Sequence, residues 1–339
     1  METIIVTGGA GYIGSHTIIE LLTKTGVTVV SVDNFSNSNA DNYKRITAIT
    51  GKAFTTIELD LCDEALLYEK LSGLQNVTGI IHFAAFKSVP ESVADPVLYY
   101  HNNLNALTNI LKFAVKQNIN NFIFSSSCSV YGNADALPVT EETPLKKAES
   151  PYGHTKQIGE EIIEFCCKSN PGFNAVLLRY FNPVGAHMSG LIGERSTAKP
   201  NNLVPIITQT AAGKNSLVVF GTDYDTRDGS CIRDFIHVSD IADAHVKALH
   251  YLSGKKNSRN LSLFNLGTGN GVSILEAIHS FEKVSGKKLD YTIGSRRAGD
   301  VIAIYANNNA ARTELNWEPQ YSLDDMMLSA WKWQQHLEE

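Results

Sequence analysis

The sequence predicts an α/β protein with a doubly wound parallel Rossmann sheet and a smaller, loop-rich α/β domain. Two patterns favour the sheet. Short apolar runs alternate with amphipathic stretches in the first half, and a glycine-rich turn joins the first run to the first amphipathic stretch. Strands covered on both faces read as near-continuous apolar runs, as they do here. Since a single core seldom grows to 339 residues, we expect two lobes.

The apolar runs define the expected strands and the amphipathic stretches define the expected helices. The strands are Thr3–Thr7, Val27–Val32, Phe54–Glu58, Gly79–Ala84, Asn121–Ser125 and Ala175–Tyr180. The helices are Tyr12–Lys24, Glu64–Leu71, Asp95–Gln117 and Pro151–Lys168. Alternation of this kind is typical of βαβ units.

The alternation breaks after Tyr180, where the chain becomes rich in Gly, Pro, Asn and Asp. A strand-then-helix pattern returns over Phe235–Leu252, and we expect the segment near 235–268 to rejoin the first sheet. Two further helices are expected, at Ser273–Ser285 and Leu323–Leu337. The predicted division is therefore residues 1–180 and residues 181–339, with the two lobes interleaved.

Composition excludes several classes of protein. With 43% hydrophobic residues the chain is globular, and its 29 basic and 35 acidic residues give a net charge of −6, so we expect no nucleic-acid partner. The sequence contains no run of 18 apolar residues, so we expect no membrane span. The cysteines are few, odd in number and form no C-x-x-C, so we expect a reducing cytoplasm, no disulfide and no metal site. They are Cys62, Cys128, Cys166, Cys167 and Cys231.

A G-x-x-G-x-x-G turn, with Gly8, Gly11 and Gly14, follows the first expected strand and opens the first helix. Such glycines let the backbone approach a pyrophosphate, and the helix N-terminus attracts the phosphates. Asp33 ends the second strand, 19 residues after Gly14, where a carboxylate accepts hydrogen bonds from a ribose. No Arg or Lys follows before Lys44. The pattern predicts NAD rather than NADP. A second glycine-rich stretch, Gly267–Gly271, lacks a partner acid and is interpreted as a structural turn.

The candidate catalytic residues are Ser127, Tyr152 and Lys156. Tyr152 and Lys156 form a Y-x-x-x-K, and this spacing puts both on one helix face, where the ammonium favours the phenolate. We expect the ammonium and the positive charge of oxidised nicotinamide together to lower the pKa of the tyrosine. The pair Tyr251 and Lys255 has the same spacing but lacks a preceding serine-ended strand, so we interpret it as chance. Ser127 ends a predicted strand, at the edge where such sheets bind ligands.

Together these motifs resemble the extended branch of the short-chain dehydrogenase/reductase superfamily, and within it the enzymes that epimerise UDP-hexoses at carbon 4. The matching stretches span nearly the whole chain in order. They are residues 7–16, 33–34, 125–132, 150–153, 179–187, 233–238 and 296–300.

The resemblance implies interconversion of UDP-glucose and UDP-galactose. NAD, held tightly and regenerated in each cycle, would oxidise carbon 4 transiently and return the hydride to either face. Tyr152 would be the base at the 4-hydroxyl, Ser127 would relay the proton, and Lys156 would bind the nicotinamide ribose. The resemblance also implies a homodimer formed through the helices Asp95–Gln117 and Pro151–Lys168.

The same resemblance assigns binding residues. For the cofactor they are Gly8, Gly11, Tyr12, Ile13, Gly14, Asp33, Asn34, Asp60, Leu61, Phe83, Ala84, Ala85, Lys87, Asn102 and Phe181, with Ser127, Tyr152 and Lys156. For the UDP-sugar they are Asn182, Asn202, Leu203, Arg233, Arg297, Asp300 and Ile304, with Ser127 and Tyr152. Ile304 is intermediate between the large residues that restrict the family to UDP-glucose and UDP-galactose and the small ones that admit N-acetylated sugars. The substrate range therefore stays open.

Three other functions are open at this point. A 4,6-dehydratase of the same fold needs an additional acid and base at the serine loop, where this chain has Ser127, Cys128 and Ser129. A uronate 4-epimerase acts on a sugar that carries a carboxylate, and the sequence does not exclude such a substrate. A non-catalytic dinucleotide-binding protein would have no need of Ser127, Tyr152 and Lys156 together.

Overall fold

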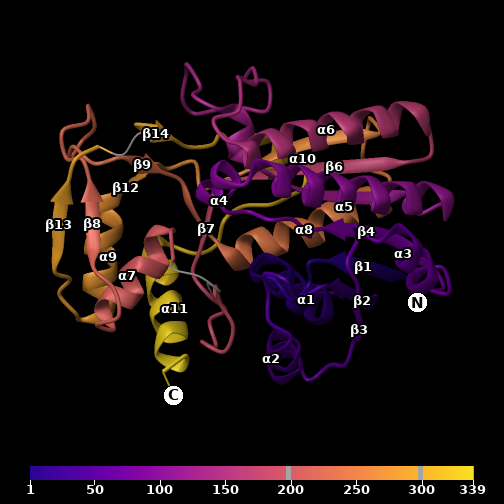
Figure 1. Cartoon of the computed structure of the whole chain (residues 1–339), viewed down its shortest axis with the longest axis horizontal. Coiled ribbons are helices and arrows are strands. Elements are labelled where there is room, and N and C mark those ends of the chain that lie inside the picture. The colour runs from indigo at the N-terminus through magenta and orange to yellow at the C-terminus, as the bar shows by residue number, and fades with distance from the viewer. Residues whose placement is uncertain (196–199, 297–300, 339) are drawn as a thin grey trace.

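A seven-stranded, all-parallel sheet forms the centre of the computed structural model, which describes residues 1–195, 200–296 and 301–338. The strand order is β11-β6-β5-β4-β1-β2-β3, so the direction of winding reverses between β1 and β4 (Figure 1). The strands are β1 (Thr3–Thr7), β2 (Thr28–Asp33), β3 (Thr55–Glu58), β4 (Val77–His82), β5 (Asn121–Ser127), β6 (Asn174–Tyr180) and β11 (Leu261–Leu266). The predicted Rossmann fold class is confirmed.

Helices cover both faces of this sheet because successive strand residues point to opposite sides. Ile4 and Val6 belong to a core shared with α1 (Tyr12–Lys24), whereas Ile5, between them, belongs to a core on the other face. The first face is covered by α1, α2 (Asp41–Thr50) and α8 (Val238–Ser253), and the second by α3 (Glu64–Leu71), α5 (Pro96–Lys116) and α6 (Pro151–Ser169).

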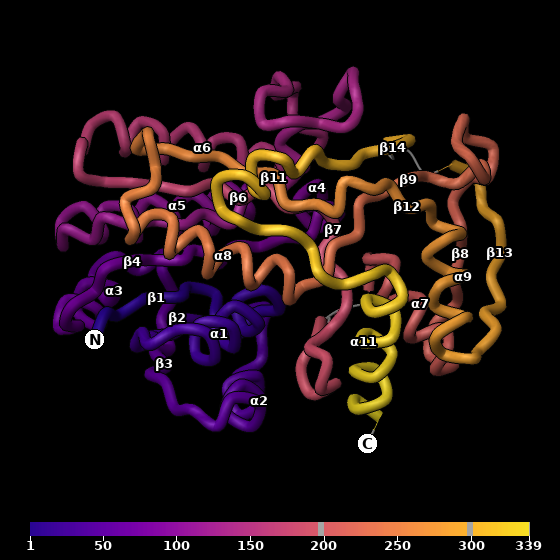
Figure 2. Tube along the Cα trace, turned by 180° about the vertical axis from the view of Figure 1, so that it is seen from behind, coloured from indigo at the N-terminus to yellow at the C-terminus, as the bar shows by residue number. Residues whose placement is uncertain are grey.

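The remaining elements gather mostly at one end of the sheet, at the left of Figure 1 and the right of Figure 2. Many of them pack around a separate core that includes Ile207, Phe281 and Trp331. The strands form pairs or triplets: β7 (Asn182–Val184) with β10 (Phe235–His237), β8 (Leu217–Phe220) with β13 (Tyr291–Gly294), and β9 (Ile232–Arg233) with β12 (Val272–Ser273) and β14 (Ala303–Ile304). The helices are α4 (Val89–Ala94), η1 (Cys128–Tyr131), α7 (Leu203–Ala211), α9 (Ile274–Ser285), α10 (Asn309–Glu314) and α11 (Leu323–His336).

The strand that rejoins the central sheet is β11 rather than the one predicted at Phe235. β10 pairs with β7 outside that sheet, and β11 then pairs with β6 and takes its edge. The limits proposed for the two lobes stay predictions.

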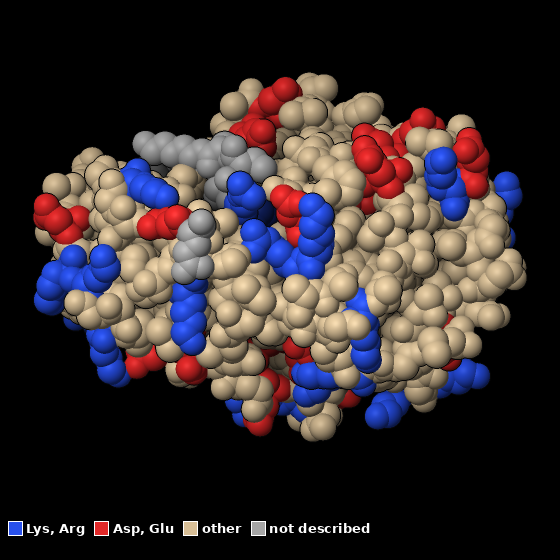
Figure 3. Space-filling view, turned by 90° about the horizontal axis from the view of Figure 1, so that it is seen from below, with Lys and Arg blue, Asp and Glu red and all other residues tan. Residues whose placement is uncertain are grey.

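Among the described residues, no helix combines the length and apolarity needed to cross a membrane. The face drawn in Figure 3 carries acidic and basic side chains interspersed.

Candidate active site

The residues predicted for the cofactor lie at the carboxyl ends of neighbouring strands. Gly8 follows β1, Asp33 ends β2, Asp60 follows β3, Phe83 follows β4 and Ser127 ends β5. Because these strands are parallel, their carboxyl ends meet at one edge of the sheet, across the point where the winding reverses. One edge therefore brings together groups that are far apart in the sequence.

The glycine loop at the start of α1 forms a narrow backbone cradle. Gly8 has a φ of +69°, and a Cβ atom there would lie 2.8 Å from the amide nitrogen of Ala84. At Gly14 a Cβ would collide with the carbonyl oxygen of Gly8. The amides of the first helical residues, Tyr12 and Ile13, have no acceptor within the helix. The loop therefore fits a pyrophosphate, which needs close backbone approach and free N–H donors.

Asp33 is built into the wall of this cradle. Its Oδ2 accepts a hydrogen bond of 2.9 Å from the amide of Ala10, and its Oδ1 accepts bonds from the amide of Phe35 (2.9 Å) and the hydroxyl of Ser38 (2.7 Å). Asn42 donates to the carbonyl oxygen of Ala10 at 2.7 Å. Asp33 thus fixes the glycine loop relative to β2 while its carboxylate stays at the strand end.

The remaining cofactor-side residues join neighbouring loops. Asn34 donates to Asp60 at 3.2 Å, and the carbonyl oxygen of the buried Leu61 accepts from Asn109 at 2.9 Å. Asn102 donates to Asn103 at 3.0 Å. Ala85 follows Ala84 in the half-buried stretch after β4.

Asn103 is a buried residue that the sequence did not single out. Its side chain exchanges hydrogen bonds with the backbone of Phe86, at 2.8 and 3.1 Å, and donates to the hydroxyl of Thr155 at 3.2 Å. Asn103 therefore connects α5, the loop after β4 and α6, the helix that carries Tyr152 and Lys156.

Ser127, Tyr152 and Lys156 meet where β5 ends and α6 begins. Lys156 Nζ donates a 2.7 Å hydrogen bond to the carbonyl oxygen of Ser125 and lies 5.9 Å from the centre of the Tyr152 ring. The Ser127 hydroxyl forms a hydrogen bond of 2.7 Å with that of Ser129, and Ser127 is near enough to the Tyr152 hydroxyl to lower its pKa. All three side chains are buried, and Ser150 caps α6 by accepting from the amide of Gly153 at 3.1 Å. Tyr152 and Lys156 thus lie on one face of α6, as their spacing predicted.

Burial controls the protonation of these groups. It raises the pKa of Tyr152 above its ordinary value, Tyr180 adds to this rise, and Ser127 opposes it. Burial also lowers the pKa of Lys156 to about 8, against an opposing effect of Glu160. For these groups the rise caused by burial outweighs the lowering by Ser127, whereas the predicted fall in the tyrosine pKa depends on Lys156 and the charge of oxidised nicotinamide together and stays a prediction.

A buried ion pair lies behind the serine strand, and sequence reasoning missed it. Arg179 donates to Glu160 through Nε at 2.9 Å and through Nη2 at 2.5 Å, and Ser126 donates to the same carboxylate at 2.5 Å. The guanidinium also lies 4.8 Å from the centre of the Tyr131 ring. Because Glu160 is four residues after Lys156, this pair connects β5, β6 and helix α6, which carries Tyr152 and Lys156.

Two residues predicted for the sugar nucleotide face each other on paired strands. Arg233 of β9 and Ile304 of β14 are register partners. Arg233 donates through Nη1 to the carbonyl oxygens of Val301 (2.7 Å) and Ile232 (2.9 Å). Ile304 is buried in a cluster with Phe181. Arg297 and Asp300 lie outside the described residues.

A carboxylate that was not predicted joins the two sets of binding residues. Glu194 Oε1 accepts from Lys87 at 2.7 Å and from Asn202 at 3.1 Å. Asn202 is the N-cap of α7, which begins at Leu203. Asn182 begins β7, and its amide donates to the carbonyl oxygen of Asp234 at 3.0 Å.

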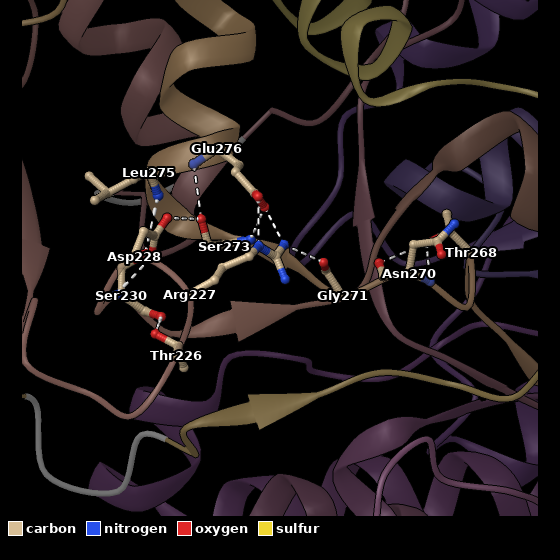
Figure 4. A network of polar contacts seen from close by, with 10 residues as sticks. All are labelled: Thr226, Arg227, Asp228, Ser230, Thr268, Asn270, Gly271, Ser273, Leu275 and Glu276. Atoms are coloured by element: carbon tan, nitrogen blue, oxygen red, sulfur yellow. Dashed lines mark hydrogen bonds and ion pairs between the residues drawn. The ribbon is translucent and has the colours of Figure 1, made fainter.

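The second glycine-rich stretch is held by protein groups. The buried carboxylate of Asp234 accepts from the amide of Thr268 at 2.8 Å. Arg227 donates to the carbonyl oxygen of Gly271 and to Glu276, each at 2.6 Å (Figure 4). The observed contacts are those of a structural turn, as interpreted from the sequence.

Comparison with known proteins identifies the family. The model of the NAD dependent epimerase/dehydratase family matches residues 4–267. A UDP-glucose 4-epimerase from Dictyostelium discoideum is 46% identical over 334 residues, which cover 98% of this chain and 96% of the relative.

Solved structures give the same result. A UDP-glucose 4-epimerase from Bifidobacterium longum in complex with NAD+ and UDP superposes with a TM-score of 0.93 at 44% identity, covering 98% of both chains. The UDP-Glc/GlcNAc 4-epimerase of Campylobacter jejuni gives 0.84 at 38% identity, covering 99% of this chain and 100% of the other. This chain therefore belongs to the NAD dependent epimerase/dehydratase family and, within it, to the UDP-glucose 4-epimerases.

Proposed function

We propose that this protein interconverts UDP-glucose and UDP-galactose by transient oxidation at carbon 4 of the hexose, with NAD as a tightly held cofactor that each cycle regenerates. The observation that carries the proposal is that Ser127, Tyr152 and Lys156 lie at the sheet edge that also forms the glycine cradle. Relatives of almost the same length support it, since their names give this reaction.

Tyr152 is the proposed base that takes the proton from the sugar's 4-hydroxyl. Ser127 opposes the rise in the pKa of the same phenol, so Ser127 is suited to relay that proton. Lys156 is held by Ser125 and carries its charge at neutral pH, since its pKa is about 8. That charge favours the phenolate and suits the binding of the nicotinamide ribose.

The cofactor would be held by the glycine loop, by Asp33 and Asn34 at its adenosine end, and by Lys156 at the other. When bound, NAD supplies the hydride acceptor and donor at carbon 4, and its oxidised ring carries a positive charge that favours the phenolate. The adenine pocket is assigned to Asp60 and Leu61. The other proposed contacts are Phe83, Ala84, Ala85, Lys87, Asn102 and Phe181.

The sugar nucleotide is assigned to a second set of residues. These are Asn182, Asn202, Leu203, Arg233, Arg297, Asp300 and Ile304. Guanidinium groups such as that of Arg233 match the geometry of a diphosphate. Ile304 is the residue that we expect to limit the group at carbon 2 of the hexose.

The dehydratase alternative is disfavoured by the chemistry of the serine loop. Burial raises the pKa of the Cys128 thiol to about 12, so this thiol stays neutral and is a poor acid and base near pH 7.

Incubation with UDP-galactose, followed by proton NMR of the carbon-4 epimers, tests the function. UDP-glucose as product supports it. A 4-keto-6-deoxy sugar would instead indicate a dehydratase, and turnover of UDP-glucuronate alone would indicate a uronate epimerase. Absence of turnover with every UDP-hexose would indicate a binding protein. A parallel sample with UDP-N-acetylgalactosamine measures the substrate range left open by Ile304.

The proposed assembly is a cytoplasmic homodimer formed through α5 and α6. An apolar groove between these helices is lined by Leu111, Val115, Ile162 and Phe165, and Phe165 is 64% exposed. Analytical ultracentrifugation tests this assembly. We expect a dimer for the unchanged protein and a monomer for Phe165→Glu, and a monomeric unchanged protein would contradict the proposal.

A further inference from the structure

Glu194 receives hydrogen bonds from both sets of residues proposed to bind ligands. Lys87 belongs to the cofactor set and Asn202 to the sugar-nucleotide set, and both donate to the same oxygen, Oε1. Although 50% of the Lys87 side chain is exposed, only 13% of the Glu194 side chain is. The carboxylate is therefore partly desolvated, which makes its charge-assisted hydrogen bonds stronger than those of a fully exposed pair.

The backbone of Glu194 is held independently of this bridge. Trp333 of α11 donates from Nε1 to its carbonyl oxygen at 2.7 Å. Lys87 is also held from a second side, with its Nζ 5.7 Å from the centre of the Tyr12 ring, whose hydroxyl donates to the carbonyl oxygen of Gly185 at 2.6 Å. Removing the carboxylate should therefore change the bridge without unfolding its surroundings.

We propose that Glu194 is a positioning residue that couples the cofactor side of the site to the sugar-nucleotide side, by holding Lys87 and Asn202 with one carboxylate oxygen. The inference rests on the proposed function, because that function assigns Lys87 and Asn202 to their ligands. Glu194 contacts no reacting atom in this account, so its effect falls on substrate binding rather than on the chemical step.

The test measures KM and kcat for UDP-galactose in the NAD-loaded, full-length protein. Glu194→Ala removes the acceptor of both bonds, and we expect KM to rise about tenfold while kcat changes less than about twofold. Glu194→Gln keeps an acceptor for Asn202 but loses the charge that faces Lys87. Its KM should therefore lie between that of the unchanged protein and that of Glu194→Ala. Glu282→Gln is the matched control, since Glu282 is similarly buried (11% exposed) and accepts from Lys288 at 2.8 Å.

A double-mutant cycle separates coupling from a local defect. Lys87→Met should raise KM for UDP-galactose in the unchanged background and change it less than about twofold in the Glu194→Ala background, because the connection is already broken. Equal effects of Lys87→Met in both backgrounds would overturn the proposal. So would an unchanged KM in Glu194→Ala, or a fall in kcat alone.

The affinity for UDP, measured by titration calorimetry on the same variants, keeps this test separate from the proposed reaction. If the unchanged protein failed to convert UDP-galactose, the proposed function would fail. The bridge would still be judged by the Kd for UDP, which should rise in Glu194→Ala and stay constant in Glu282→Gln. A constant Kd in Glu194→Ala would then refute it.

Discussion

Lys156 donates a 2.7 Å hydrogen bond to the backbone carbonyl oxygen of Ser125, two residues before Ser127. This bond fastens helix α6 to strand β5 and leaves the ammonium 5.9 Å from the centre of the Tyr152 ring. One side chain thereby fixes the relative placement of the proposed base and the proposed relay.

Replacing Lys156 by Met should lower kcat about 100-fold or more, because it removes both the charge that favours the phenolate and the bond to β5. The matched control is Lys255→Met in the second Y-x-x-x-K. Lys255 is exposed and lies beyond the end of α8, so this variant should keep full activity. Equal loss in the two variants would contradict the role of Lys156.

Gly14→Ala should lower NAD affinity about tenfold or more, since the added methyl collides with the Gly8 carbonyl oxygen and deforms the cradle. NAD released on denaturation, measured by chromatography, reports the occupancy. A Cβ at Gly73 meets no atom within 4 Å, so Gly73→Ala should keep its NAD. Full NAD occupancy in Gly14→Ala would show that the loop does not hold the cofactor.

Acid should destabilise the protein through its buried histidines. Burial lowers the pKa of His16 and His82 to about 3 and that of His237 and His245 to about 4. The unfolded chain therefore binds more protons than the native one below about pH 6.5, and the free energy of unfolding falls as pH decreases, by about 1.4 kcal/mol per pH unit for each proton.

Asp240 acts in the opposite sense, because burial raises its pKa to about 6 and the native state binds the extra proton. Burial raises the pKa of Glu20, Glu141 and Asp234 in the same way, and it lowers the pKa of a fifth histidine, His187. Among the described residues five histidines therefore act against four carboxyl groups, and the net slope keeps the sign given by the histidines. Urea unfolding between pH 7 and pH 5 measures how the free energy of unfolding changes with pH. A free energy of unfolding that rises as the solution is acidified would contradict this account.

Glu160→Gln should lower the free energy of unfolding by about 3–5 kcal/mol, because it leaves the buried Arg179 guanidinium without its counter-charge. Only 6% of either side chain is exposed. The exposed pair of Glu64 and Lys112 provides the control, and Glu64→Gln should cost less than about 1 kcal/mol. Similar urea midpoints for the two variants would contradict the larger loss of stability expected for Glu160→Gln.

The sequence predicted most elements of the central sheet because strands buried on both faces leave continuous apolar runs. Several strand limits differed from the prediction by one or two residues, and two of these differences have a clear physical reason. β4 ends at His82, before the predicted Ala84, because the next residues leave the sheet to approach Gly8. β5 runs on to Ser127, because its polar serines still pair with β6. The helix α2 was missed because it buries only Asn42 and Ile46, which make a weak periodic signal.

The candidate site was predictable where a spacing carries the chemistry, as for the glycine loop, Asp33, and the pair Tyr152 and Lys156. Glu160 and Glu194 were missed because a single glutamate has no spacing to identify it, and both act through contacts with residues far away in the chain. The rise that burial causes in the Tyr152 pKa could not be predicted because burial is a property of the fold.

The most direct test of the central claim is the conversion of UDP-galactose to UDP-glucose by Tyr152→Phe, followed by proton NMR with the NAD content and the melting temperature measured on the same sample. We expect fold and NAD to be kept while kcat falls about 100-fold or more, since the proposed base for the proton of the 4-hydroxyl is gone. Turnover equal to that of the unchanged protein would contradict it.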